Sequence, residues 1–247
     1  MSDLNGWGSN PGLLELEEAE IHVWRAYLDR TEIVLPQFEA TLSTDEKARA
    51  DRFVFSRDRN QFVGTRGILR DLLGRYLGRS PEELQFDYSV LGKPCLRGEI
   101  FKQSVLFNVS HSHGLALLAF TVGRNLGVDV EFVRSGFASE EIADRYFSAQ
   151  EVAELRALPP TMRTEAFFLC WTRKEAYIKA RGEGLQIPLH SFHVSLTPGK
   201  PERLQSPDSS RWNLRSLSPD PRYVGALVAE GNDWQLRYWD WKPIECD

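Results

Sequence analysis

The order of the predicted elements indicates an α+β protein made of two similar halves. Each half has a strand, two helices and then several strands, with apolar residues that alternate in the strands and recur every three or four positions in the helices. The 247 residues are enough for one large domain or two of modest size. We expect α+β halves at 1–125 and 126–247, although residue-level similarity between them is too weak to demonstrate a duplication.

The first half follows a loose leader, 1–19, that is rich in glycine, asparagine and acids. The segment at 21–28 alternates as a strand does, and Ser43 with Glu46 at capping-box spacing predicts the start of a helix. A second helix is expected in RNQFVGTRGILRDLLGRYLG because its apolar residues share one helical face. Further strands are expected at LQFDYSV, VLFNV and LALLAFTV.

The second half opens with the strand GVDVEFV at 127–133. Ser148 and Glu151 form another capping box, and a long helix is expected at 163–181. Later strands are predicted in SFHVSL, YVGALVA and WQLRYWDW. The segment 197–221 contains five prolines and several serines, so we expect a loop.

The charge of the chain is acidic overall and basic in one segment. A formal net charge of −5 argues against a general nucleic-acid binder, which usually has a basic excess. The cations are nevertheless concentrated between residues 47 and 79, which predicts a cationic surface. These nine residues are Lys47, Arg49, Arg52, Arg57, Arg59, Arg66, Arg70, Arg75 and Arg79.

The cysteines and the apolar runs indicate a cytoplasmic protein with no membrane partner. Cys95, Cys170 and Cys246 are odd in number and widely spaced, so they predict neither a disulfide framework nor a zinc motif. No signal peptide is visible, and no apolar run approaches the ~20 residues that span a bilayer.

Two carboxylates in GVDVEFV are candidate metal ligands. The two-residue period of a strand places Asp129 and Glu131 on one face and the valines on the other. A hard cation such as Mg²⁺ takes few protein oxygens and fills its shell with water and phosphate, so this pair suits it. The alternative is an ordinary polar face of a half-buried strand.

The sequence WTRKEAYIKARGEGL at 171–185 adds a third carboxylate and two lysines. Glu175 and Lys179 lie one turn apart on one helical face, while Lys174 points about 100° away. Glu175 is therefore a candidate third ligand, and the lysines are candidate phosphate contacts. Gly182 and Gly184 would let the chain turn back beside the site. The alternative is a surface ion pair between residues i and i+4.

The segment FNVSHSHG at 107–114 is predicted to end a strand in a turn that carries Ser110, His111, Ser112 and His113. Small hydroxyls and exposed amides in such a turn would form an anion cradle. An H-x-H zinc pair is the alternative, but it has no third ligand at metal spacing. We interpret His113 as structural.

These motifs together resemble the Sfp-type 4′-phosphopantetheinyl transferases. The matching segments are GKP, FNVSHS, GVDVE, FS…E and WTRKEAYIKARGEGL, in order and at fitting spacing over about 43–196. GVDVE followed by W-x-x-KE-x-x-x-K is the specific part. The resemblance implies the fold of that family, two pseudo-symmetric α/β halves with the active site in the cleft between them.

The implied activity transfers 4′-phosphopantetheine from coenzyme A to a serine of an apo acyl or peptidyl carrier protein and releases adenosine 3′,5′-bisphosphate. The implied cofactor is Mg²⁺, with Mn²⁺ as an alternative. Metal ligands would be Asp129, Glu131 and Glu175, and catalytic residues Glu175 and Lys179. Implied coenzyme A contacts are Arg66, Lys93, Ser110, His111, Lys174, Lys179, Lys47 and Arg49.

The resemblance assigns nucleotide binding to the first half and metal binding with catalysis to the second. It departs from the family at Glu46, which occupies a position where some relatives have a phosphate-binding lysine. For the proton of the carrier serine, Glu175 or a metal-bound water relayed through Glu131 or Glu175 are alternatives. We expect a monomer, because one chain supplies both halves.

The implied carrier partner is acidic, and fatty-acid, polyketide and peptide-synthetase carriers all fit. An apolar and basic strip in FVRSGFASEEIADRYF could receive it, or its phenylalanines could belong to the core. The strip residues are Phe132, Val133, Arg134, Phe137 and Arg145. Two other functions use the same features: a metal-dependent hydrolase of phosphate esters or pyrophosphates, and a non-catalytic module that binds coenzyme A or a carrier.

Overall fold

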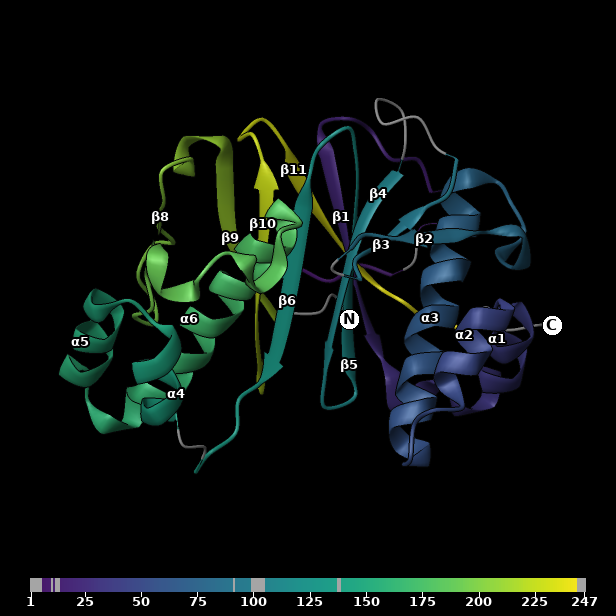
Figure 1. Ribbon diagram of the computed structural model, residues 1–247. Coiled ribbons are helices and arrows are strands. Elements are labelled where there is room, and N and C mark those ends of the chain that lie inside the picture. Colours follow the sequence, from purple (N-terminus) through teal and green to yellow (C-terminus); the bar gives the residue numbers. More distant parts are fainter. Residues whose placement is uncertain are drawn as a thin grey trace. The chain divides into compact units, whose positions relative to one another are not determined.

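The computed structural model describes residues 6–9, 11, 14–90, 92–98, 105–136 and 139–243. The chain forms two compact units (Figure 1). The first contains Met1–Phe107, Gly114–Gly123 and Gln235–Asp247, and the second contains Asn108–His113 and Arg124–Trp234. These units differ from a single division at residue 125 by the segments 108–113, 124–125 and 235–247. The division into nucleotide and metal sides stays a prediction.

The first unit combines a four-stranded sheet with helices. The strand order is β11 (Gln235–Asp240), β1 (Glu20–Tyr27), β5 (Leu115–Val122) and β4 (Val105–Ser112). Strand β1 is antiparallel to β5 and parallel to β11. The last strand of the chain therefore returns to the sheet of the first unit, which the simple order of elements did not reveal.

Three α-helices of the first unit are α1 (Leu35–Thr41), α2 (Thr44–Ala50) and α3 (Ser56–Leu77) (Figure 1). The capping box of Ser43 and Glu46 is present at the start of α2, as predicted. Helix α3 packs on the sheet through Tyr76, whose ring lies 5.0 Å from that of Phe120. The short strands β2 (Phe86–Tyr88) and β3 (Pro94–Leu96) pair with each other, and 3₁₀ turns occur at η1 (Leu28–Val34) and η2 (Pro81–Glu83).

The second unit has an antiparallel three-stranded sheet in the order β6 (Leu126–Phe132), β10 (Tyr223–Glu230) and β9 (Trp212–Asp220). Its helices are α4 (Ser139–Tyr146), α5 (Ala149–Ala157) and α6 (Pro160–Arg181). The predicted capping box of Ser148 and Glu151 begins α5. The remaining elements are η3 (Gly184–Gln186), η4 (Leu189–Ser191), β7 (His193–Val194), β8 (Leu204–Gln205) and η5 (Ser209–Arg211).

Three local predictions were wrong. The expected loop 197–221 contains β8, η5 and the nine-residue strand β9, whose buried residues alternate despite the nearby prolines. The leader is not uniformly loose, because Trp7 and Leu14 are buried and Gly8 bridges to Trp239. Strand β4 extends to Ser112, so Ser110, His111 and Ser112 lie in a strand rather than in a turn.

Gly127 sets the contact between α6 and β6. A Cβ atom at this position would lie 2.2 Å from the carbonyl oxygen of Ala176 and 2.3 Å from the amide nitrogen of Ala180. Any side chain would therefore force the helix backbone away from the strand. The glycine of GVDVE lets α6 cross β6 directly, which brings the helix turn with Glu175 and Lys179 over the strand with Asp129. No helix in the described part of the chain is long and apolar enough to cross a membrane.

Candidate active site

Asp129 is the centre of a polar cluster in the second unit. The hydroxyl of Ser110 donates to Asp129 Oδ1 over 2.7 Å, and Lys179 Nζ donates to the same oxygen over 2.7 Å. Lys179 also donates to Ser110 Oγ at 3.1 Å and to the carbonyl of Val128 at 3.2 Å. Asp129 Oδ2 is buried and has no hydrogen-bond partner among the described residues. One carboxylate oxygen is thus saturated and the other is left for a further ligand.

Glu131 lies two residues further along β6 and is half-buried. Ser112 Oγ donates to Glu131 Oε2 over 2.7 Å. Burial raises the pKa of Glu131; the hydrogen bond from Ser112 opposes this rise, and the charge of Asp129 adds to it. Glu131 therefore feels the negative charge of Asp129, as expected for two carboxylates on one strand face.

Glu175 of α6 belongs to the same electrostatic cluster. Burial and the charge of Asp129 raise the pKa of Glu175 to about 7, with a further contribution from Glu131 and an opposing one from Lys179. Asp129 and Glu131 therefore act electrostatically on Glu175, and the assignment of the three carboxylates as metal ligands stays a prediction. They do not form a ready coordination shell, since no group of three His, Cys, Asp or Glu residues in the described ranges is arranged to hold a metal.

The alternation of β4 explains which residues reach this cluster. Asn108, Ser110 and Ser112 are buried on one strand face and each contacts β6. The Asn108 side chain accepts a hydrogen bond from the Val128 amide at 2.8 Å. His111 is exposed, because neighbouring strand residues point to opposite faces. The period-two pattern N-x-S-x-S opposite D-x-E could have identified Ser112, to which the sequence analysis gave no role.

His113 has a backbone conformation that non-glycine residues rarely adopt, with φ 47°. The Tyr223 hydroxyl donates to the His113 carbonyl at 2.7 Å, and the His113 ring stacks on Phe132 with centroids 5.0 Å apart. The Arg222 guanidinium lies over the Phe132 ring, 5.5 Å from its centroid. His113 thus holds the turn beside Glu131, which agrees with a structural interpretation.

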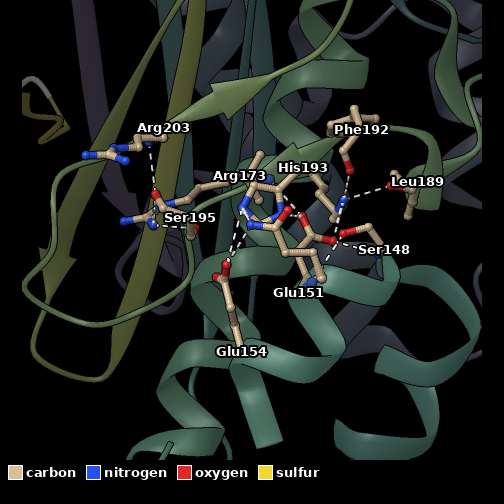
Figure 2. A network of polar contacts seen from close by, with 12 residues as sticks. Ser148, Glu151, Glu154, Arg173, Leu189, Phe192, His193, Ser195 and Arg203 are labelled. Atoms are coloured by element: carbon tan, nitrogen blue, oxygen red, sulfur yellow. Dashed lines mark hydrogen bonds and ion pairs between the residues drawn. The ribbon is translucent and has the colours of Figure 1, made fainter. Parts of the chain in front are cut away.

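Lys174 does not have the predicted surroundings of a phosphate contact. Its side chain is fully buried and donates to the carbonyls of Leu189 and Phe192, each over 2.7 Å, and its ammonium lies 2.8 Å from Glu151 Oε2. Leu189, Phe192 and Glu151 are labelled in Figure 2. These three acceptors match the three N–H groups of the ammonium. The prediction fails because a helix position 100° from Glu175 faces the protein interior here.

The nucleotide candidates of the first unit have mixed surroundings. Arg66 Nε lies 3.3 Å from Glu46, and Arg66 Nη1 is buried without a hydrogen-bond partner in the described ranges. Glu46 is almost fully buried and also bonds Arg70, so it cannot replace a phosphate-binding lysine. Lys47 and Arg49 are exposed on α2, and Lys93 follows Gly92, whose φ is 79°, in the turn before β3.

The residues of the predicted carrier strip differ in their contacts and exposure. Phe132 is half-buried between His113 and Tyr223, while Arg134 and Arg145 are exposed. Val133 packs against the core of the second unit. Phe137 lies outside the described residues.

The sequence matches two family profiles that together span most of the chain. Residues 125–234 match the 4′-phosphopantetheinyl transferase superfamily, and residues 29–122 match the profile described as 4′-phosphopantetheinyl transferase, N-terminal.

Relatives of similar length carry the same description. The 4′-phosphopantetheinyl transferase HetI from Nostoc sp. is 42% identical over 94% of this chain and 97% of that protein. The 4′-phosphopantetheinyl transferase Sfp from Bacillus subtilis is 28% identical over 86% of this chain and 93% of that protein. A putative 4′-phosphopantetheinyl transferase from Synechocystis sp. is 34% identical over 88% of this chain and 86% of that protein.

Among solved structures, a holo-(acyl-carrier-protein) synthase from Bacillus anthracis in complex with CoA (3′,5′-ADP) is 20% identical and covers 43% of this chain and 94% of that chain, with a TM-score of 0.38. The near-complete overlap with a 42% identical relative, together with the carboxylate and lysine cluster of β6 and α6, leads to one assignment. The chain belongs to the 4′-phosphopantetheinyl transferase superfamily.

Proposed function

We propose that this protein transfers the 4′-phosphopantetheine group of coenzyme A to a serine hydroxyl of an apo acyl or peptidyl carrier protein. The serine oxygen attacks the phosphorus that bears pantetheine, and the bond from this phosphorus to the bridging oxygen of the pyrophosphate breaks. The electron pair leaves with adenosine 3′,5′-bisphosphate, and the serine proton passes to a base. The observation that carries the proposal is the cluster of Asp129, Glu131, Glu175 and Lys179 in a chain of this family.

The donor set fits a magnesium ion. Asp129 Oδ2 is a buried oxygen without a hydrogen-bond partner in the described ranges, and the pKa values of Glu131 and Glu175 are raised by burial first and by the charge of Asp129 in addition. Oxygen-only ligands suit Mg²⁺, and Mn²⁺ is the alternative. Asp129, Glu131 and Glu175 would hold the ion. When bound, it would neutralise charge on the pyrophosphate.

Lys179 is the residue to which we assign charge neutralisation on the leaving group. Its ammonium is anchored on Asp129 while its side chain remains 27% exposed. Phosphoryl transfer depends mainly on positioning and charge neutralisation, which a partly exposed lysine beside carboxylates can supply. Glu175 has a pKa matched to accepting the serine proton near neutral pH.

The two roles of Glu175, proton acceptor and metal ligand, predict different pH profiles for transfer. A base with a pKa near 7 gives an acid limb close to neutrality. A carboxylate bound to the cation ionises at much lower pH, so the acid limb of the profile shifts to lower pH. Measuring kcat between pH 5 and 9 at saturating Mg²⁺ separates these roles.

Coenzyme A contacts are proposed in both units. The buried and unpartnered Nη1 of Arg66 supports a polar ligand near this guanidinium. Lys47, Arg49 and Lys93 supply further positive charge for the nucleotide phosphates, and Ser110 contributes through the Asp129 cluster. His111 is proposed as a contact on the opposite face of β4.

The proposed acceptors are acidic carriers of fatty-acid, polyketide or peptide synthesis, received in part by the strip around Phe132, Arg134 and Arg145. We further propose a cytoplasmic monomer. The free thiols of Cys95 and Cys170 support a reducing compartment.

The test incubates the protein with several apo carriers, coenzyme A and Mg²⁺, then weighs each carrier by mass spectrometry. We expect addition of one phosphopantetheine group to the carrier serine. No addition on any carrier would overturn the proposal. Breakdown of coenzyme A without a carrier would indicate the hydrolase, and carrier binding without turnover would indicate the non-catalytic module.

A further inference from the structure

The loop between α2 and α3 exposes three consecutive apolar side chains. Phe53, Val54 and Phe55 are 38%, 89% and 69% exposed. They are half of the six large hydrophobic residues that are exposed in the described part of the chain. Isolated exposed apolar residues are common, whereas a contiguous group indicates an interaction surface.

Arginines border this apolar group at both ends. Arg52 precedes it and Arg57 follows it two residues later, and both side chains are exposed. Segment 47–59 has five cations and two acids in a protein of net charge −5. We call residues 52–57, which include the first two residues of α3, the Arg52–Arg57 loop.

The structure divides the cationic run of the sequence into two groups. Arg66 and Arg70 face the buried Glu46, Arg75 pairs with Asp71, and Arg59 pairs with Glu39. These four arginines are paired with acidic residues of the first unit. Arg52 and Arg57 have no such internal acidic partner among the described residues, so their charge is directed to solvent around the apolar group.

The Arg52–Arg57 loop is held in place by its own contacts. The Phe53 amide donates to the Ala50 carbonyl at 3.2 Å, and the Phe53 ring lies 5.6 Å from the ring of Phe62 in α3. The Arg49 guanidinium in turn lies over the Phe62 ring, 5.2 Å from its centroid. Phe53 therefore anchors the loop while Val54 and Phe55 remain exposed, which reduces the ordering cost of binding a partner.

We propose that the Arg52–Arg57 loop is a docking surface for the acidic carrier protein that accepts phosphopantetheine. This inference rests on the proposed function, which supplies the partner class. An acidic surface with an apolar residue complements both features of the loop, because arginines steer an acidic partner and aromatic residues anchor it.

The test replaces Val54 and Phe55 by aspartate in one variant, V54D/F55D. We expect the Kd for an apo carrier, measured by surface plasmon resonance without coenzyme A, to rise at least about tenfold. In the transfer assay the KM for the carrier rises similarly, whereas the KM for coenzyme A and the kcat at saturating carrier change less than about twofold. The matched controls are Ile33→Asp and Val90→Asp, which alter side chains that are 90% and 101% exposed elsewhere in the first unit.

A second variant, R52E/R57E, tests the charges. It should weaken carrier binding and flatten its dependence on salt concentration. An unchanged carrier Kd in V54D/F55D, with transfer intact, would overturn the docking surface and leave the proposed function standing. Parent protein that binds no carrier would overturn both. Parent protein that binds vesicles of anionic lipid, with this binding lost in V54D/F55D, would overturn the carrier as occupant in favour of a membrane.

Discussion

The two units contain the same buried ion pair at the same place in their helices. In the first unit the capping-box residue Glu46 pairs with Arg70, and in the second the capping-box residue Glu151 pairs with Lys174. Helices α3 and α6 each have 22 residues, and Arg70 and Lys174 each lie fourteen residues after the first residue of their helix. Both helices end at a glycine in the left-handed conformation.

The equivalence extends to the acceptors beyond the helix. Arg70 donates to the carbonyls of Pro81 and Leu84, which are the first residue and the C-cap of η2. Lys174 donates to the carbonyls of Leu189 and Phe192, which are the first residue and the C-cap of η4. This shared arrangement supports the duplication that residue identities alone could not demonstrate.

The units differ one residue further along each helix. Asp71 and Arg75 form an ion pair at 3.2 Å, and Asp71 also accepts a hydrogen bond from Trp241. The equivalent residues Glu175 and Lys179 have no such bond in the described structure, since Lys179 turns to Asp129 on β6. Asp129 of β6 therefore takes the place of Glu175 as the ion-pair partner of Lys179. The carboxylates of this cluster then outnumber its lysine. The same scaffold is neutralised in the first unit and is a candidate metal site in the second.

Breaking the ion pair of the second unit should have the largest effect on stability. Lys174→Met leaves Glu151 as a buried, uncompensated charge and removes two bonds to carbonyls. We expect the free energy of unfolding to fall by about 3–5 kcal/mol, as measured by urea denaturation. The double variant E151Q/K174M should lose less, because it removes the buried charge together with its partner.

A loss below about 1 kcal/mol in Lys174→Met would contradict the assigned role. An equally large loss in the double variant would show that the carbonyl bonds, rather than the charge, carry the effect. Circular dichroism before denaturation confirms that each variant is folded.

The equivalent change in the first unit is Arg70→Met. We expect a smaller loss of about 3 kcal/mol, because Arg66 still faces Glu46 after the substitution. The same denaturation series measures it, with Arg79→Met as a control at an exposed cation. If Arg70→Met lowered the free energy of unfolding no more than Arg79→Met does, the two ion pairs would not be structurally equivalent.

Sequence patterns were sufficient for the elements that depend on local chemistry. Both capping boxes, the helices α2, α3, α5 and α6, and the face shared by Asp129 and Glu131 follow from spacing alone, whereas α1 and α4 were not predicted. The burial of Lys174 does not, because its acceptors are the carbonyls of a 3₁₀ turn fifteen and eighteen residues away. The extension of β4 through Ser112 depends likewise on contacts with β6, which no single segment encodes.

The repeat between the units was hidden for a related reason. A backbone carbonyl and a carboxylate accept bonds from either arginine or lysine, so the same buried ion pair uses Arg70 in one unit and Lys174 in the other. The β9 strand was missed because proline clusters at both ends of 197–221 indicated a loop, whereas burial on β10 determines the strand.

Removing the charge of Glu175 should separate activity from stability. Glu175→Gln is expected to lower kcat for transfer about a hundredfold, equivalent to ~2.7 kcal/mol of transition-state stabilisation. The unfolding free energy should change by less than ~0.5 kcal/mol or rise, because the substitution relieves repulsion from Asp129 and Glu131.

The matched control is Asp71→Asn at the equivalent position of the first unit. It should keep kcat within about twofold, since that carboxylate is already neutralised by Arg75. Equal losses of activity in both variants would remove the distinction between the neutralised and the catalytic unit.

The smallest expected effect is a pH dependence of stability without divalent cations. The folded protein holds the Glu175 proton until about pH 7, whereas the unfolded chain releases it near the ordinary value of 4.5. The unfolded state therefore binds fewer protons between these values, and stability falls as the pH rises from 4.5 to 7. The raised pKa of Glu131 acts in the same direction.

The pKa of His22 acts in the opposite direction, because burial lowers it below 6.5 and stability then rises with pH. The difference between parent and Glu175→Gln isolates the carboxylate, since both proteins contain His22. We expect the melting temperature of the parent to decline relative to the variant between pH 5 and 8, and Mg²⁺ to reduce this decline because it binds the ionised carboxylates of the folded state. Parallel profiles without Mg²⁺ would mean that neither burial nor the charges of Asp129 and Glu131 raise the pKa of Glu175, and the electrostatic contrast between the two units would then fail.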